Sequence, residues 1–490
     1  MRSSNIPLTL IGNSLAVQVA ATQRAARGES TLVINTGGPW GGYFSGINLD
    51  GSLWDAGMVA FEFTSFRTPT APASLATYDP MRRNDIGRFT QIVQDYVEKR
   101  LPTREIRPLQ MWIGDRYIPD LLLGNEVEAV RQLPCFMAMY EELIKNVPQN
   151  MSPSWLAKHK DSWPTRDIPN YDAISRINHG NVLHEAVFAP FGQKVMGQDA
   201  DRLHGLFHRI PWLPLYWQET LVSALKGENG ILKPTIYSQP IGAPVAQLCI
   251  DLTQEMMISP HITVRNDRVQ SIERIGSGFQ LRLEHTGTVH TTRLGWSQSP
   301  RQGLSACGVN IESKAESRIP LMLVFIRYTG NVLRKEFSVV HTPSPDTGFY
   351  RVNNLSESSD ANARMTTKII VEANPDVFNS HYQLSGKSQS VEHVMTQELQ
   401  RLGLVAPGVE PSFIHVLRLP NALPLPTLES NDAWLSEQKK LLETLPGIEL
   451  LTNSAGPFAT SLSDQIVQGL QLVDRRIYKS ARRESVAEAL

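Results

Sequence analysis

The stretch from Ile6 to Gly46 constrains the fold of this chain more than any other. A short apolar run, Ile6 to Ile11, leads through a glycine into an alanine- and valine-rich segment of helical length. A second apolar run, Thr31 to Ile34, follows. A strand, a tight turn, a helix and a second strand in this order predict a βαβ unit with parallel strands. We therefore expect an α/β fold with a Rossmann-like domain.

The turn after the first strand matches a dinucleotide site in part. In the Gly-x-Gly-x-x-Gly pattern the glycines serve the turn, the approach of phosphate and helix packing. Gly12, Ser14 and Val17 occupy these positions, and Leu15 opens the helix, whose N-terminus would attract phosphate. Asn35 stands where a carboxylate normally holds the ribose, and its amide can still hydrogen-bond a hydroxyl. A βα unit that binds no nucleotide is the alternative interpretation.

A glycine-rich loop and a second short motif follow. The loop runs from Gly37 to Tyr43 and includes Trp40, Gly41 and Gly42, and the motif is Leu53 to Met58. With these segments the chain resembles the flavoprotein group that contains amine oxidases, protoporphyrinogen oxidase, phytoene desaturases and UDP-galactopyranose mutase. The resemblance implies a glutathione reductase-type FAD-binding domain with an inserted α+β substrate domain. It places Gly41 and Gly42 after the ribose position and the second motif beside the flavin, with Met58 replacing a glycine.

The middle of the chain extends this resemblance. Residues 262–273 alternate apolar and polar side chains, as a half-buried strand pair does. The resemblance assigns Val269 to the position whose backbone meets the adenine, although a plain core strand would also explain a valine. The strands continue to Leu294, and we expect a loop from Ser297 to Gly303.

The C-terminal part supplies a second strand-turn-helix segment. A strand from Ile448 to Leu451 precedes Gly456, and residues 462–469 have helical character. The resemblance implies that Gly456, Asp464 and Gln465 lie near FAD. We expect Asp464 to cap N–H groups in the first helical turn. A plain C-terminal docking helix is the alternative.

Three residues are our candidates for a catalytic role, namely Tyr43, Met58 and Arg351, because the resemblance places them toward the flavin or the substrate. Arg351 lies near the end of a strand that we predict over residues 348–354, and a guanidinium can bind phosphate oxygens in pairs. A salt bridge is the equally weighted alternative for Arg351. Lys194 and Tyr216 fall in an order of residue types that is similar to UDP-galactopyranose mutase.

The resemblance also sets the expected domain boundaries. Residues 1–66, 230–310 and 440–490 would form the FAD-binding domain. Residues 67–229 and 311–439 would form the substrate-binding domain.

Composition excludes several function classes. The 490 residues are 41% hydrophobic and 19% charged, as in globular proteins with sizeable cores. The formal net charge of -1 gives no electrostatic reason to bind nucleic acid or a membrane surface. No apolar run predicts a signal peptide or a membrane span. We therefore expect a cytoplasmic protein with a small-molecule substrate as its partner, and a homo-oligomer is an open alternative.

The cysteines and histidines give no metal site. Cys135, Cys249 and Cys307 are scattered without the spacing of metal ligands or a disulfide framework, which favours a reducing compartment. His204 and His208 stand four apart in the segment 199–208, which we expect to be helical, and this spacing can place two imidazoles on one metal. No third ligand is apparent, so we assign no metal.

The leading prediction is an FAD-dependent oxidoreductase that transfers hydride from a small or nucleotide-linked metabolite to the flavin. One alternative is a redox-neutral sugar-nucleotide isomerase similar to UDP-galactopyranose mutase. The other is a cofactor-free binding subunit, which the departures at Ser14, Val17, Asn35 and Met58 would explain.

Overall fold

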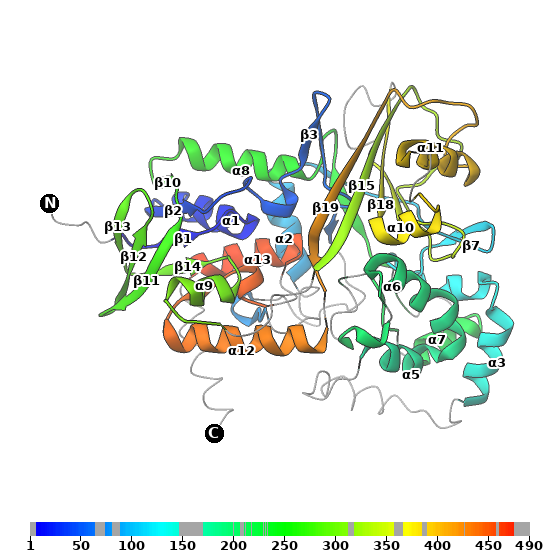
Figure 1. The fold of residues 1–490 in the computed structure, drawn as a ribbon, viewed down its shortest axis with the longest axis horizontal. Coiled ribbons are helices and arrows are strands. Elements are labelled where there is room, and N and C mark those ends of the chain that lie inside the picture. Colours follow the sequence, from blue (N-terminus) through cyan, green and yellow to red (C-terminus); the bar gives the residue numbers. More distant parts are fainter. Residues whose placement is uncertain are drawn as a thin grey trace. The chain divides into compact units, whose positions relative to one another are not determined.

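The chain folds into two compact units. The computed structural model describes residues 6–63, 74–80, 89–146, 170–198, 200–205, 210, 212–216, 218–228, 230, 232, 234–311, 318–356, 366–384, 390–425, 427–456 and 460–474. Unit 1 comprises Met1–Arg104, Tyr237–Ala315 and Asn431–Leu490, and unit 2 comprises Glu105–Ile236 and Glu316–Ser430. Figure 1 shows the elements of both, and each unit is described by itself.

Unit 1 is built on a five-stranded parallel sheet in the order β10-β2-β1-β14-β20. The strands are β1 (Thr9–Ile11), β2 (Thr31–Asn35), β10 (Ile262–Asn266), β14 (Leu294–Trp296) and β20 (Glu449–Leu450). The chain leaves β1 toward β2 on one side, and β14 later pairs on the other side. This is the topological switch point at which doubly wound folds bind ligands. The parallel sheet confirms the predicted Rossmann-like α/β fold.

Six α-helices accompany this sheet within the described part of unit 1, besides the short 3-10 helices η1 (Gly42–Phe44), η2 (Leu75–Thr77) and η9 (Thr452–Ser454). The α-helices are α1 (Leu15–Ala25), α2 (Thr90–Glu98), α8 (Ala246–Ile258), α9 (Pro300–Ala306), α12 (Leu428–Thr444), which begins three residues before the unit boundary, and α13 (Leu462–Val473). Helix α1 is rich in alanine and valine because it is buried on nearly every side. Gly469 of α13 lets the two helices approach, since a Cβ there would lie 2.6 Å from Val19 Cβ.

Short strands complete unit 1. They are β3 (Ile47–Leu49), β4 (Ser52–Trp54), β5 (Phe61–Glu62), β6 (Thr103–Glu105), β9 (Tyr237–Pro240), β11 (Val269–Ile275), β12 (Gly278–Leu283) and β13 (Gly287–Thr291). Strands β11, β12 and β13 form an antiparallel sheet of their own, and β9 pairs with β5.

Two expectations about unit 1 differ from the structure. The expected loop from Ser297 to Gly303 contains helix α9, which Ser299 caps in a capping box with Gln302 and which has a proline in its first turn. The sequence predicts that the second domain starts at residue 67, whereas α2 belongs to unit 1. The physical reason is that Val93 and Val97 of α2 share a hydrophobic cluster with α1 and α13.

Unit 2 contains a seven-stranded mixed sheet in the order β19-β15-β18-β17-β16-β7-β8. The strands are β7 (Leu109–Ile113), β8 (Arg116–Pro119), β15 (Arg318–Thr329), β16 (Val339–His341), β17 (Arg351–Asn354), β18 (Thr366–Ala373) and β19 (Phe413–Pro424). All neighbours pair antiparallel except β16 and β7, which are parallel. This sheet and its helices confirm the predicted α+β architecture of the inserted region.

The helices of unit 2 surround two hydrophobic clusters. They are η4 (Val127–Gln132), α3 (Phe136–Asn146), α5 (Tyr171–Leu183), the π-helix η5 (His184–Phe188), α6 (Ala189–Met196), η6 (Ala200–Arg202), α7 (Gln218–Leu225), α10 (Pro375–His381) and α11 (Val391–Arg401). The expected helix over 199–208 has one short 3-10 turn, η6, and His208 lies outside the described residues. Among all described helices, none is long and apolar enough to cross a membrane.

Candidate functional site

The tight turn at the end of β1 is fixed by packing. Gly12 has φ +118°, which disfavours any side chain, and a Cβ there would overlap Ser297 Oγ. Ser297 follows β14, and both its backbone N–H and its hydroxyl donate to the Ile11 carbonyl at 3.0 Å. The first glycine of the pattern therefore allows the ends of β1 and β14 to approach each other closely. Ser297 itself was not apparent from the sequence, because a lone serine after a strand has no distinctive spacing.

Helix α1 starts directly after this turn. Ser14 is its N-cap residue, and the Ser14 hydroxyl accepts the N–H of Val17 at 3.4 Å. The first N–H groups of a helix have no partner inside the helix, so they suit an anion such as a pyrophosphate. Leu15 and Ala16, which carry two of these N–H groups, have no exposed surface. The serine thus replaces the second glycine with a capping group; Ser14 itself is half-buried, whereas the two residues after it are covered.

The glycine-rich loop lies against this helix start. The Gly41 N–H donates to the Asn13 carbonyl at 2.7 Å, and Gly41 forms an isolated parallel bridge with Ser14. Gly41 has φ +93°, and a Cβ there would lie 2.7 Å from Cys249 Cβ on α8. Trp40 packs on a hydrophobic cluster that includes residues of α1. The resemblance thus singled out a loop that the structure places beside the turn.

Asn35 uses its side chain within its own loop. Its Oδ1 accepts the Gly37 N–H at 3.0 Å, and its Nδ2 donates to the Gly38 carbonyl at 3.5 Å. The Asn35 backbone carbonyl accepts the N–H of Asp267 at 3.0 Å, two residues before Val269. The structure therefore brings the ends of β1 and β2 near the start of β11, as the resemblance implies. The amide that should face a ribose is engaged in a local turn.

The second motif, Leu53 to Met58, supports the start of helix α8 through Asp55. Asp55 is 1% exposed, and its carboxylate accepts the N–H groups of Val245 at 3.0 Å and Ala246 at 2.9 Å, where α8 begins. Burial raises the pKa of Asp55 to about 6, although both backbone hydrogen bonds act in the opposite direction. Met58 is half-buried and Tyr43 is 56% exposed. Whether these two face a cofactor stays a prediction.

The C-terminal segment contains a partly buried polar network. Ser461, rather than Asp464, caps α13, because its hydroxyl accepts the Asp464 N–H at 3.1 Å. The Asp464 carboxylate instead accepts hydrogen bonds from the hydroxyls of Ser461 at 2.6 Å and Tyr78 at 2.7 Å. Burial raises the pKa of Asp464 to about 6. Tyr78 also accepts a hydrogen bond from Gln468. The expected cap at Asp464 is therefore wrong, since a serine three residues earlier fits the N-cap better.

Two other predicted residues lie in the same region. Gly456 follows β20, and its N–H donates to the Thr452 carbonyl at 3.3 Å. Thr452 in turn donates to the Ser297 carbonyl at 2.9 Å, which links this segment to the end of β14. Gln465 donates to the Thr460 carbonyl, and its buried Oε1 has no hydrogen-bond partner among the described residues. These links extend the polar carboxyl edge of the sheet from β2 to β20.

Arg351 in unit 2 is engaged with a carboxylate. It is 1% exposed and donates to both carboxylate oxygens of Glu372, at 3.0 and 2.6 Å. The Arg351 guanidinium also stacks 3.8 Å above the Trp212 ring. Its Nη1 has no hydrogen-bond partner among the described residues. The salt bridge weighed for Arg351 is present, and a phosphate-binding role stays a prediction.

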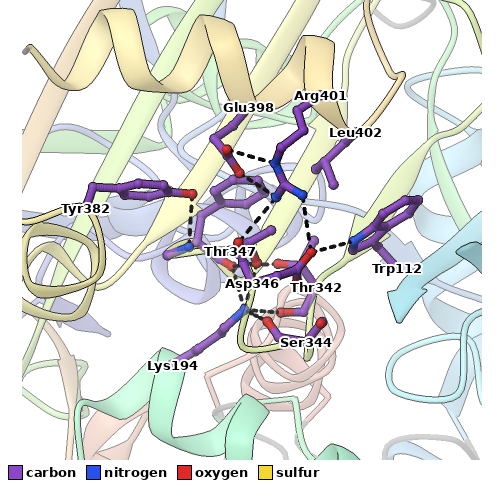
Figure 2. A network of polar contacts seen from close by, with 12 residues as sticks. Trp112, Lys194, Thr342, Ser344, Asp346, Thr347, Tyr382, Glu398, Arg401 and Leu402 are labelled. Atoms are coloured by element: carbon purple, nitrogen blue, oxygen red, sulfur yellow. Dashed lines mark hydrogen bonds and ion pairs between the residues drawn. The ribbon is translucent and has the colours of Figure 1, made fainter. Parts of the chain in front are cut away.

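Lys194 of α6 holds the loop between β16 and β17, as Figure 2 shows. Its ammonium donates to the Thr342 carbonyl at 2.8 Å, to the Thr347 hydroxyl at 2.7 Å and to the Ser344 carbonyl. Burial lowers the pKa of Lys194 to about 7. On the other side of the loop, Arg401 and Trp112 donate to the Asp346 carboxylate. The buried lysine therefore fixes a loop and does not face a described cavity.

The chain was compared with known proteins at the level of sequence and of structure. No protein-family model and no curated protein matches the sequence. Solved structures do match. Reduced UDP-galactopyranose mutase aligns over 97% of this chain and 95% of its own, with a TM-score of 0.66 and 12% identity. Cyclohexylamine oxidase from Brevibacterium oxydans aligns over 98% and 100%, with a TM-score of 0.57 and 12% identity. Putrescine oxidase bound to putrescine aligns over 97% and 99%, with a TM-score of 0.53 and 12% identity.

The chain has the flavin amine oxidase-like fold. This confirms the predicted resemblance at the level of structure, because the matches cover nearly the full length of the chains. At 12% identity the likeness carries the fold and leaves the reaction open. In unit 1, the backbone of the tight turn after β1 and the carboxyl ends of the parallel strands have an arrangement that fits a dinucleotide. It departs from the pattern in the side chains at Ser14 and Asn35, which are already engaged.

Proposed function

We propose that this chain binds FAD through unit 1 and acts as an FAD-dependent oxidoreductase on a small or nucleotide-linked metabolite. The observation that carries the proposal is the Gly12 turn at the carboxyl end of β1, where α1 begins beside the Gly41 loop. Parallel sheets of this kind bind dinucleotides at this position. In this proposal unit 2 binds the substrate.

Backbone groups would contribute most of the cofactor contacts. The N–H groups at the start of α1 would face the pyrophosphate, with the loop from Gly41 to Tyr43 beside it. Val269 and Asn35 would lie toward the adenosine, and Gly456 and Gln465 toward the flavin. When bound, FAD would accept a hydride from the substrate. We expect such a protein to act in the cytoplasm.

A cofactor-free binding subunit is the second candidate. Two observations favour it: the amide of Asn35 closes its own turn, and Leu15 and Ala16 have no exposed surface. FAD binding would have to open this helix start, which would cost affinity.

A redox-neutral isomerase is the third candidate. It is favoured by the structural likeness to UDP-galactopyranose mutase, with its TM-score of 0.66. Conversion of a UDP-sugar without consumption of an oxidant would distinguish this isomerase from an oxidoreductase.

The test is the visible absorption spectrum of the full-length chain purified from cells, followed by identification of any nucleotide released on denaturation. The proposal expects flavin bands and released FAD. A colourless protein that releases no flavin, and stays colourless after incubation with FAD, would contradict it and support the binding subunit. Gly276→Ala, at a turn with open space around it, is the matched control for glycine substitutions in the site.

A further inference from the structure

A chain of hydrogen bonds joins two buried histidines in unit 2. His184 Nε2 lies 2.9 Å from Asp172 Oδ1, and His184 Nδ1 lies 2.8 Å from Ser175 Oγ. Ser175 Oγ lies 2.9 Å from His179 Nδ1, and His179 Nε2 accepts the N–H of Tyr216 at 2.9 Å. Both imidazoles have no exposed surface, whereas the Asp172 side chain is 30% exposed.

The direction of these hydrogen bonds is fixed at both ends. A backbone N–H can only donate, so neutral His179 must carry its proton on Nδ1. A carboxylate can only accept, so neutral His184 must carry its proton on Nε2. The two requirements meet at Ser175, which accepts from His179 and donates to His184. The geometry therefore sets opposite tautomers in the two histidines.

The chain is closed to protons at one end. The Tyr216 N–H cannot pass a proton on, so the chain cannot relay protons through the unit. A proton can enter at Asp172, which lines a cavity of about 450 Å³ together with Glu185 and Asp201. The arrangement can take up a proton and has no path to deliver it elsewhere.

The same hydrogen bonds bridge a break in a helix. Gly180 has φ 76° and ψ 165°, which interrupts α5. The N–H groups of Asn181 and Val182 after the break are accepted by Glu142 of α3, at 2.8 and 2.9 Å. His184 lies beyond the break, and its two ring nitrogens bind residues that precede the break. Its imidazole thus connects the π-helix η5 to the first part of α5.

Several charged groups surround the chain. Arg176 donates to Asp172 at 3.0 Å and to Glu185 at 2.8 Å. Tyr171 faces Ser175 from the same helix. The elements packed on α5 carry further carboxylates, namely Glu142 on α3, Glu219 on α7 and Asp201 on η6.

These surroundings set the protonation preference of the two histidines. Burial lowers the pKa of both histidines, and for His184 the attraction of Asp172 opposes burial only in part.

We propose that this hydrogen-bond chain is a pH-sensitive latch, which holds η5 against α5 while both histidines are neutral and releases residues 179–188 when a proton enters. A proton on His184 would turn Nδ1 into a donor. The Ser175 oxygen would then face two N–H donors, one from each histidine. The Ser175 hydroxyl hydrogen would lose its acceptor, which is Nδ1 of His184. The proposal does not depend on a cofactor, so it stands or falls separately from FAD binding.

The sign of the pH effect follows from linkage. The pKa of each histidine in the closed form lies below the ordinary value of 6.5, which applies to the opened form. Below that pH the opened form binds protons that the closed form does not. Opening should therefore increase as the pH falls below 6.5.

Hydrogen–deuterium exchange of the full chain tests the latch. As the pH falls from about 6.5 to about 5, after correction for the intrinsic exchange rate, opening of peptides spanning 171–190 should increase by up to about tenfold per pH unit for each histidine that gains a proton. Peptides of α11 should not change. Equal pH dependence in both regions would overturn the proposal.

Two variants and one direct measurement complete the test. Ser175→Ala should make the 171–190 peptides exchange rapidly at neutral pH and remove most of their pH dependence. His393→Gln, at an exposed position of α11 in the same unit, should leave both unchanged. Because Ser175→Ala can also impair folding, nitrogen NMR of the wild-type imidazoles gives an independent answer. Opposite tautomers for His179 and His184 are expected, and identical tautomers would overturn the proposal.

Discussion

Asp55 stabilises the start of α8 although its burial is unfavourable. Its carboxylate accepts two N–H groups at the helix N-terminus, where negative charge is favoured. Burial outweighs these bonds and raises the pKa of Asp55 to about 6, against an ordinary value of 3.8. Between these two pH values the folded form holds a proton that the unfolded form has released. The Asp55 contribution to stability therefore falls as the pH rises through this window, and it is constant above about pH 6.

The substitution Asp55→Asn measures this linkage. The amide offers one acceptor to the two N–H groups, so we expect a loss of about 1 to 2 kcal/mol in the free energy of unfolding at low pH. Between about pH 4 and about pH 7 the difference should change by about 2 to 3 kcal/mol in favour of the variant, which then becomes as stable as the wild type or more stable, because the wild type alone has a carboxylate that must ionise. Urea unfolding at the two pH values checks this. A loss that grows with pH would contradict the assigned pKa.

Gly41 is a residue whose missing side chain matters. Its φ of +93° and its contact with Cys249 both oppose a Cβ. We expect Gly41→Ala to lower the free energy of unfolding by about 1 to 3 kcal/mol. The added substitution Cys249→Ala removes the sulfur but keeps the Cβ, so it should restore only part of the steric loss and leave the backbone strain. Gly276→Ala, at φ +55° with no atom within 4 Å, isolates the strain alone. Equal losses in Gly41→Ala and Gly276→Ala would show that Cys249 does not crowd the loop.

At the scale of elements, periodicity identified most of the framework and missed two local features. The apolar run predicted from Thr31 to Ile34 forms strand β2, because both of its faces are buried. Helix α9 was missed because its seven residues are too short to show a period, although its capping box and its proline were visible signals. The expected helix over 199–208 rested on composition alone.

Lys194 joins two elements that are far apart in sequence, and its removal should loosen one of them. Lys194→Met keeps the length of the side chain but leaves the Thr342 and Ser344 carbonyls without this donor. We expect a loss of about 1 to 3 kcal/mol in the free energy of unfolding. Amide exchange should increase in residues 342–350. Lys226→Met, at an exposed position at the end of α7, is the control. Unchanged exchange in the loop would show that Arg401 and Trp112 suffice to hold it.

At the scale of the whole molecule, the sequence predicted the fold better than the site. The order of strands, turns and helices carries the flavin amine oxidase-like architecture even at 12% identity, because the hydrophobic pattern and the turn glycines determine it. The site depends on where single side chains point. The cap made by Asp55 on α8 could not be predicted, since its partners are 190 residues away in the chain and are set by tertiary structure. The turn closed by Asn35 is local, but it was not predicted because the amide was assigned to a ribose.

The most direct test of the central claim is an equilibrium titration of the full-length chain with FAD, followed by flavin fluorescence. Saturable binding of one FAD per chain is expected. Tighter binding is also expected in the double variant Ser14→Gly with Asn35→Glu, because glycine is an acceptable N-cap and a carboxylate strengthens the bond to ribose. Absence of saturable binding in both proteins, with the fold intact by circular dichroism, would contradict the account.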